Sequence, residues 1–307
     1  KFAQKYKKMF RLLSKESNIF SIPVYLFFLL TIVITFNAFN FSVLNIISAV
    51  FTFAGIALGY FLFNKVNLTY QTHIPLFLYT FLAFALYSGG LDIGVAISLF
   101  VSSFVLLILT STNDTLRKSS YMLIGSILAV NFIFLPATWA LVLFVIIHII
   151  GTSGRILLNL FRLFFGMLLI ALFYFSIVFF LHYNAWDDAY FPFGDFKMAQ
   201  NIQPLLYLIP IGLLMMYGIA QHFFYFNEKS PISKFKYTFI LLFTVAQSVS
   251  IVLYMGNYYG YLLLMVFPCA VIVSRAIYFM PKYWQKELSL WMVIIFLILF
   301  KIAVYIH

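Results

Sequence analysis

Long apolar runs recur along this chain of 307 residues. The hydrocarbon core of a bilayer is about 30 Å thick, and one helix needs roughly 20 apolar residues to cross it. Hydrophobic residues make up 64% of the chain and charged residues 9%, whereas roughly 25% of a soluble globular protein is charged. A soluble fold of this length cannot bury so much apolar surface. The sequence therefore predicts an all-α integral membrane protein.

Eleven apolar runs are candidate transmembrane helices. They lie near residues 19–36, 43–63, 74–88, 91–110, 121–135, 137–151, 156–182, 203–225, 236–254, 259–280 and 288–306. The stretch 121–151 is too long for one comfortable span and short for two. Pro136 lies near its middle, where it breaks or kinks a helix. We therefore predict two short helices around Pro136.

The basic residues predict an orientation for these spans. With eleven crossings, the inner loops receive most of the cations that give the net charge of +11, among them Lys65, Arg117, Lys229 and Lys282. Such an excess is typical of cytoplasmic loops. We expect a polytopic bundle of about eleven helices, with the N-terminus inside and the C-terminus outside. Because the charge follows the loops, it indicates membrane topology and no nucleic-acid partner.

The first 18 residues form a segment distinct from the single transmembrane domain that we expect over residues 19–307. Phe2, Tyr6, Met9 and Phe10 recur at helical spacing, with lysines between them. This pattern is typical of an amphipathic helix that lies on the anionic lipids of the cytoplasmic face. A flexible basic tail is the alternative interpretation.

The longest outer loop, residues 183–204, combines carboxylates with aromatic rings. Neighbouring carboxylates can act as an acid/base pair or hold a divalent cation, so Asp187 and Asp188 are the candidate catalytic residues. Trp186, Tyr190 and Asp195 are candidates for substrate binding, because rings stack on sugars or prenyl chains. The alternative is a belt of aromatic anchors at the interface. The chain has no nucleotide-binding loop and no histidine or cysteine set for a metal.

Basic and small residues within the spans supply further candidates. Arg155, Asn159 and Arg162 fall at i, i+4 and i+7, so one helix face could bind a lipid phosphate, or the arginines could snorkel to the headgroups. Arg275 and Lys301 lie about a turn from helix ends, and we expect them to snorkel. The glycines of the segment GIALG, Gly55 and Gly59, predict close helix packing and a surface for a membrane partner or a homo-oligomer.

Two segments carry a resemblance to a known group of proteins. The stretch from SSYMLIGSILAVNFIFLPATW through HIIGTSGRILLNLFRLFFGMLL, and the closing FPCAVIVSRAIYFMPKYWQKELSLWMVIIFLIL, resemble uncharacterised polytopic inner-membrane proteins of Bacteroidota, a family with a domain of unknown function. More distantly, the pair of short helices is similar to integral-membrane glycosyltransferases and polysaccharide polymerases. This resemblance implies an enzyme of envelope glycan or lipid-linked-sugar assembly in the bacterial inner membrane.

Two other functions stay open: a transporter or lipid flippase, and a non-catalytic membrane subunit of a larger complex. A deep outer cavity that reaches Asp187 would indicate the enzyme. A cavity across the midplane, lined by Asn131 or Gln247, would indicate transport. A solid bundle would indicate the subunit.

Overall fold

The structure, a computed structural model, describes residues 9–18, 20–38, 42–66, 68–69, 71–110, 120–182, 190–194 and 196–306. Within these ranges the regular structure is helical, apart from one isolated β-bridge between Glu16 and Thr72. The elements are α1 (Met9–Leu13), α2 (Ser21–Asn37), α3 (Val43–Val66), α4 (His73–Leu86), α5 (Ile93–Leu109), α7 (Tyr121–Phe134), η1 (Pro136–Thr138), α8 (Ala140–Thr152), α9 (Ile156–Phe180), α10 (Gln203–Leu206), α11 (Ile209–Phe224), α12 (Pro231–Tyr254), η3 (Tyr259–Met265), α13 (Val266–Phe279) and α14 (Tyr283–Ile306). The all-helical fold class is confirmed.

Five of the described helices are long and apolar enough to cross a membrane: α3, α9, α12, the joined η3 and α13, and α14. Shorter apolar helices stand beside them: α2, α4, α5, α7, the joined η1 and α8, and α11. Many large apolar side chains on these helices are exposed, for example Leu157 at 84% and Phe180 at 78%. Exposed apolar side chains in such numbers are typical of surfaces that face lipid. The chain is thus a multi-helix membrane protein.

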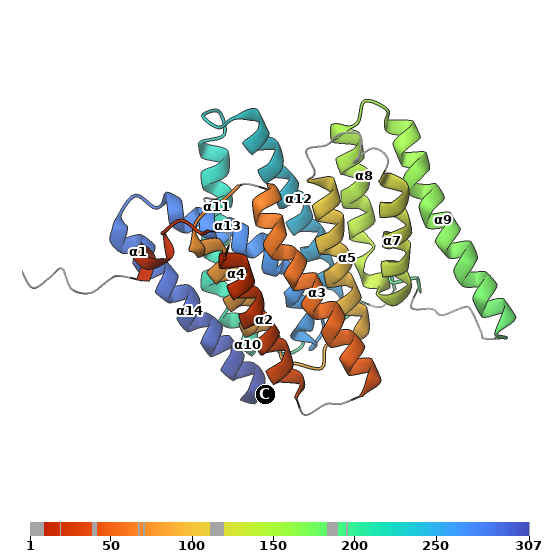
Figure 1. Ribbon diagram of the computed structural model, residues 1–307, viewed down its shortest axis with the longest axis horizontal. Coiled ribbons are helices and arrows are strands. Elements are labelled where there is room, and N and C mark those ends of the chain that lie inside the picture. The colour runs from red at the N-terminus through yellow and green to blue at the C-terminus, as the bar shows by residue number, and fades with distance from the viewer. Residues whose placement is uncertain are drawn as a thin grey trace, which may run out of the picture.

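The helices stand side by side, and their connections gather at two ends (Figure 1). The α8–α9 and α11–α12 turns lie at the top of the view, and the C-terminal end of α14 lies at the bottom. The helix α9 forms one edge of the bundle, where it packs on α7. The candidate site described below belongs to the end that carries the α11–α12 turn.

Pro136 divides the chain between α7 and α8, as predicted. Helix α7 ends at Phe134, and Leu135 has a non-helical conformation (φ −146°, ψ 81°) before the 3₁₀ turn that Pro136 begins. Proline lacks the amide hydrogen that a continuing helix requires. The turn is held from both sides, because Asn131 Nδ2 donates to Thr138 Oγ1 over 2.7 Å and Trp139 Nε1 donates to Tyr254 Oη over 3.0 Å.

Gly55 and Gly59 are buried within the bundle. A Cβ atom at Gly55 would lie 2.7 Å from the backbone nitrogen of Phe100 in α5, and one at Gly59 would collide with the ring of Tyr79 in α4. Close packing at this motif is therefore intramolecular. The helix face that the sequence assigned to a partner or a second copy is filled by α4 and α5 of the same chain.

The described part of the N-terminal segment packs on protein. The backbone amides of Met9 and Phe10 donate to the two carboxylate oxygens of Glu287 in α14, each over 2.9 Å. The buried ring of Phe10 meets Tyr283 edge to face, with 5.7 Å between ring centres. Helix α1 spans only Met9–Leu13, and residues 1–8 of the predicted amphipathic helix lie outside the described residues. Phe10 faces α14, whereas the sequence predicted that it faces lipid.

Candidate functional site

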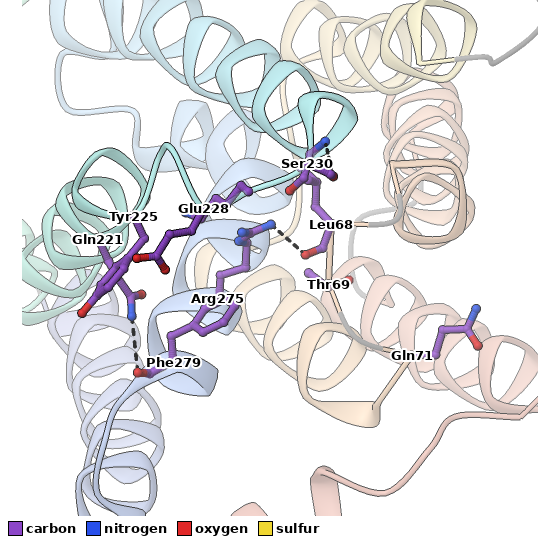
Figure 2. Close-up of a pocket in the computed structure, with 11 residues that line it drawn as sticks. Leu68, Thr69, Gln71, Gln221, Tyr225, Glu228, Ser230, Arg275 and Phe279 are labelled. Atoms are coloured by element: carbon purple, nitrogen blue, oxygen red, sulfur yellow. Dashed lines mark hydrogen bonds between the residues drawn. The ribbon is translucent and has the colours of Figure 1, made fainter.

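A pocket of about 790 Å³ opens beside the α11–α12 turn (Figure 2). Its wall comes from five places: the segment before α4 (Leu68, Thr69), the end of α11 (Gln221), the turn itself (Tyr225, Glu228, Lys229), the start of α12 (Ser233) and the end of α13 (Arg275). Ligand pockets commonly enclose about 300–1,000 Å³. This pocket is therefore large enough for a small polar ligand or a lipid headgroup.

Arg275 is the buried cation of this pocket. Its side chain is 9% exposed, and its Nη1 donates to the carbonyl oxygen of Leu68 over 3.0 Å, as Figure 2 shows. Its guanidinium carbon lies 4.7 Å from the centre of the Tyr237 ring and 5.6 Å from that of Phe279. Carbonyl and ring contacts suit a guanidinium, which is weakly hydrated and planar. The prediction that Arg275 snorkels to the headgroups was wrong.

Rings from two helices and the guanidinium of a third form a stack beside the pocket. His222 of α11 lies flat against Tyr237 of α12, with 4.1 Å between ring centres and 26° between ring planes. Arg275 of α13 also lies over Tyr237. The Tyr237 hydroxyl donates to the carbonyl oxygen of Gly218 over 3.3 Å. These contacts fix the position of Arg275 relative to α11 and α12.

Lys229 adds a second cation from the turn. Its ammonium nitrogen lies 3.1 Å from His222 Nδ1 and 3.2 Å from the carbonyl oxygen of His222. The pKa of Lys229 is lowered to about 8, by burial first and by the charge of Arg275 second, while the carboxylate of Glu228 acts in the opposite direction. Because the ammonium donates to Nδ1, the neutral ring carries its hydrogen on Nε2. That nitrogen is buried and has no hydrogen-bond partner among the described residues.

The pocket is suited to an anion. Arg275 and Lys229 contribute two positive charges to its wall, and Glu228 contributes one negative charge. An arginine beside a lysine binds phosphate through charge-assisted hydrogen bonds, which are stronger than neutral ones. Among the described residues, no group of three or more histidine, cysteine, aspartate or glutamate side chains could hold a metal ion.

Arg155, Asn159 and Arg162 come together at the start of α9. They line a smaller pocket of about 440 Å³ together with Gly154 and Leu158. Asn159 is buried, and its Nδ2 donates to Ser153 Oγ over 2.5 Å. Its amide therefore holds the α8–α9 turn in place, while the two arginines lie beside it in the pocket wall.

The outer-loop candidates are described only in part. Trp186, Asp187, Asp188 and Asp195 lie outside the described residues. Tyr190 is described: its hydroxyl lies 2.7 Å from that of Tyr174 in α9. The structure thus ties Tyr190 of the 183–204 loop to α9.

The sequence did not single out the pocket at the α11–α12 turn. Gln221, Glu228 and Lys229 lie close together in the chain, but Arg275 and Leu68 are far from them in sequence. The available signal was Arg275, because an ionisable residue in an apolar run marks a functional site by default.

The comparisons with known proteins give a family and no near relative. A model for a family of unknown function matches residues 9–306. No curated protein and no solved structure matches the chain.

Proposed function

Since this chain belongs to DUF6427, a family of unknown function, we propose that it is a multi-pass protein of the bacterial inner membrane that binds a phosphate-bearing, lipid-linked ligand at its cytoplasmic end. The pocket of Arg275 and Lys229 holds the phosphate. The biological role is the assembly of envelope glycans from lipid-linked sugars. This role rests on the distant resemblance to integral-membrane glycosyltransferases and polysaccharide polymerases.

The proposed topology has eleven spans, with the N-terminus in the cytoplasm and the C-terminus outside. Support comes from the five long apolar helices and the shorter ones beside them. The α8–α9 and α11–α12 turns lie at one end of the bundle and the end of α14 at the other. Arg155 and Lys229 both belong to the first of these ends, which accords with the excess of basic residues in cytoplasmic loops.

The observation that carries the proposed ligand is the buried Arg275 in the wall of a pocket of about 790 Å³. Placing a cation in a buried position costs free energy unless its contacts or a ligand offset the loss of water. Arg275 has a carbonyl and two rings as contacts, and an anion that enters between Arg275 and Lys229 adds charge-assisted hydrogen bonds to them and favours the charged form of Lys229. Arg155, Asn159 and Arg162 form a second phosphate site in this proposal.

Lipid flipping is supported less well than assembly. A flippase needs a polar path at the membrane midplane, yet the buried Gln247 donates to Ser102 over 3.0 Å and Asn131 to Thr138 over 2.7 Å. These bonds join neighbouring parts of the bundle, as interhelical packing requires. For an enzyme, Asp187 and Asp188 of the outer loop are the proposed catalytic residues, with Trp186, Tyr190 and Asp195 on the substrate and a divalent cation as a candidate cofactor. In the proposed topology this outer site and the cytoplasmic phosphate pocket lie on opposite sides of the membrane, so each binds its own ligand.

Ligand binding to the purified protein in detergent tests the pocket. The probes are geranyl phosphate, which carries a prenyl chain, and glycerol 3-phosphate, which is fully soluble. We expect both to bind, geranyl phosphate more tightly, and Lys229→Gln to weaken each by about tenfold, which corresponds to about 1.4 kcal/mol. Lys282→Gln is the matched control, because Lys282 is exposed and does not line this pocket.

Three outcomes separate the alternatives. Equal affinity for the two phosphates would indicate a soluble phosphate compound as the ligand. Binding of neither probe, or equal losses in Lys229→Gln and Lys282→Gln, would reject the pocket as an anion site. If the double variant Asp187→Asn, Asp188→Asn rescues a deletion strain fully, these two residues are not catalytic. The protein would then bind its ligand without transferring a sugar.

A further inference from the structure

A groove runs between α2 and α4 and does not share a lining residue with the phosphate pocket. It encloses about 700 Å³. Phe77, Phe81 and Phe84 lie at i, i+4 and i+7 of α4, and all three line the groove. The rings of Phe77 and Phe81 stack at 5.8 Å with 12° between their planes, and those of Phe81 and Phe84 lie 6.0 Å apart. One wall is therefore a continuous row of aromatic rings.

The facing wall is also apolar. Val24, Phe28 and Ile32 lie at i, i+4 and i+8 of α2 and line the groove. Val24 is 52% exposed and Phe28 55% exposed, so these side chains are open to whatever enters. From His73 to Phe84 the groove extends for roughly 16 Å, at about 1.5 Å per helical residue.

The groove is polar at one end. Asn18, Tyr25 and His73 lie there, with the Tyr25 hydroxyl 3.4 Å from His73 Nδ1. The backbone amide of His73 donates to the carbonyl oxygen of Lys15 over 3.3 Å, which places exposed Lys15 at this end. Arg11, a turn earlier in the chain, is also exposed, and Glu16 is the neighbouring acid.

We propose that this groove binds one acyl chain of an anionic phospholipid, with the headgroup beside Lys15 and His73. The apolar walls match a hydrocarbon chain, and the basic end complements a phosphate. A helix from a partner protein is the alternative occupant that the experiment distinguishes. The proposal is independent of the proposed function, because the two sites have separate linings.

Native mass spectrometry of the delipidated protein tests the occupant. Phosphatidylglycerol is the anionic probe and phosphatidylcholine the zwitterionic one. We expect one molecule of phosphatidylglycerol to remain bound to the wild-type protein at concentrations where phosphatidylcholine is lost. Val24→Trp fills the groove and should lower the bound fraction at least tenfold. Val50→Trp is the matched control, because Val50 of α3 is 60% exposed and lines neither this groove nor the phosphate pocket.

A second pair of variants tests the headgroup. Lys15→Gln should reduce the preference for phosphatidylglycerol several-fold and leave phosphatidylcholine binding unchanged, whereas Lys282→Gln should alter neither. Circular dichroism and gel filtration check that each variant is folded. Equal retention of phosphatidylglycerol by Val24→Trp and Val50→Trp would overturn the proposal. It would also be overturned if the wild-type protein held both lipids equally, or if a polypeptide occupied the groove. Retention of phosphatidylglycerol by Lys229→Gln separates this site from the phosphate pocket.

Discussion

The ammonium nitrogen of Lys301, in the last turns of α14, lies 3.1 Å from the carbonyl oxygen of Phe84 in α4. It also donates to the carbonyl oxygen of Tyr87 and lies 4.1 Å from the centre of the Phe36 ring. The last carbonyl groups of a helix have no partner within the helix. Lys301 therefore closes the end of α4 from a neighbouring helix and is 8% exposed. The prediction that it snorkels to the outer headgroups was wrong.

Replacing Lys301 by methionine should destabilise the protein. The substitution keeps the length of the side chain and removes the donor, so buried carbonyl oxygens lose a partner at a cost of about 1–3 kcal/mol. Thermal unfolding in detergent, followed by circular dichroism, measures the change. Lys282→Met is the control, because Lys282 is exposed. If both variants unfold at the wild-type temperature, the contacts of Lys301 do not stabilise the fold.

Replacing Gly166 by alanine should loosen α9. A Cβ atom at Gly166 would collide with the carbonyl oxygen of Met122 in α7, and backbone atoms cannot rotate away. Overpacking of this kind costs about 1–3 kcal/mol, and α9 is an edge helix that packs on α7. Limited proteolysis should cut the variant faster at the α8–α9 turn. Gly212→Ala in α11 is the control, since nothing lies within 4 Å of its added Cβ, and equal cleavage of both variants would contradict the expectation.

Anion binding should depend on pH through Lys229. In the free protein the pKa of Lys229 is lowered to about 8, by burial first and by Arg275 second. A bound anion favours the charged form, so the pKa is higher in the complex than in the free protein. The affinity should therefore change little between about pH 7 and pH 8 and fall as the pH rises further, by up to about tenfold per unit.

Lys229→Arg supplies the control for this pH dependence. An arginine stays charged over the whole range, so its affinity for geranyl phosphate should be level between pH 7.5 and 9.5. The second pKa of a phosphate monoester is about 6, so the ligand itself does not titrate in this range. A wild-type affinity that is level across the same range would exclude Lys229 as a ligand of the anion.

The topology can be tested with single cysteines in intact cells. Cys269 is the one native cysteine in the sequence and is buried, so it contributes little background. Thr152→Cys, at the α8–α9 turn, should react with an impermeant maleimide only after the cells are opened. Met198→Cys, which is 61% exposed in the segment between the seventh and eighth proposed spans, should react in intact cells. Labelling of position 152 in intact cells would contradict the count of eleven spans.

The sequence predicted the class of fold and the helix break because both depend on local chemistry. Apolar runs of sufficient length form helices in lipid whatever lies beside them, and Pro136 ends a helix because it lacks an amide hydrogen. The same reasoning placed Arg155, Asn159 and Arg162 on one face, because i, i+4 and i+7 coincide in any α-helix. The structure brings these three residues to one small pocket.

The sequence alone therefore determined that this protein is a helical membrane protein and which apolar segments form its helices, since length and hydrophobicity act within each segment. Only the tertiary structure decided the partners of its polar groups. It placed Arg275 against Leu68 and Tyr237, Lys301 against Phe84, and Gly55 against the backbone of α5. Each of these contacts joins segments far apart in the chain. The lateral packing of helices decides which of them meet, and hydrophobicity is too similar from one helix to the next to specify that order.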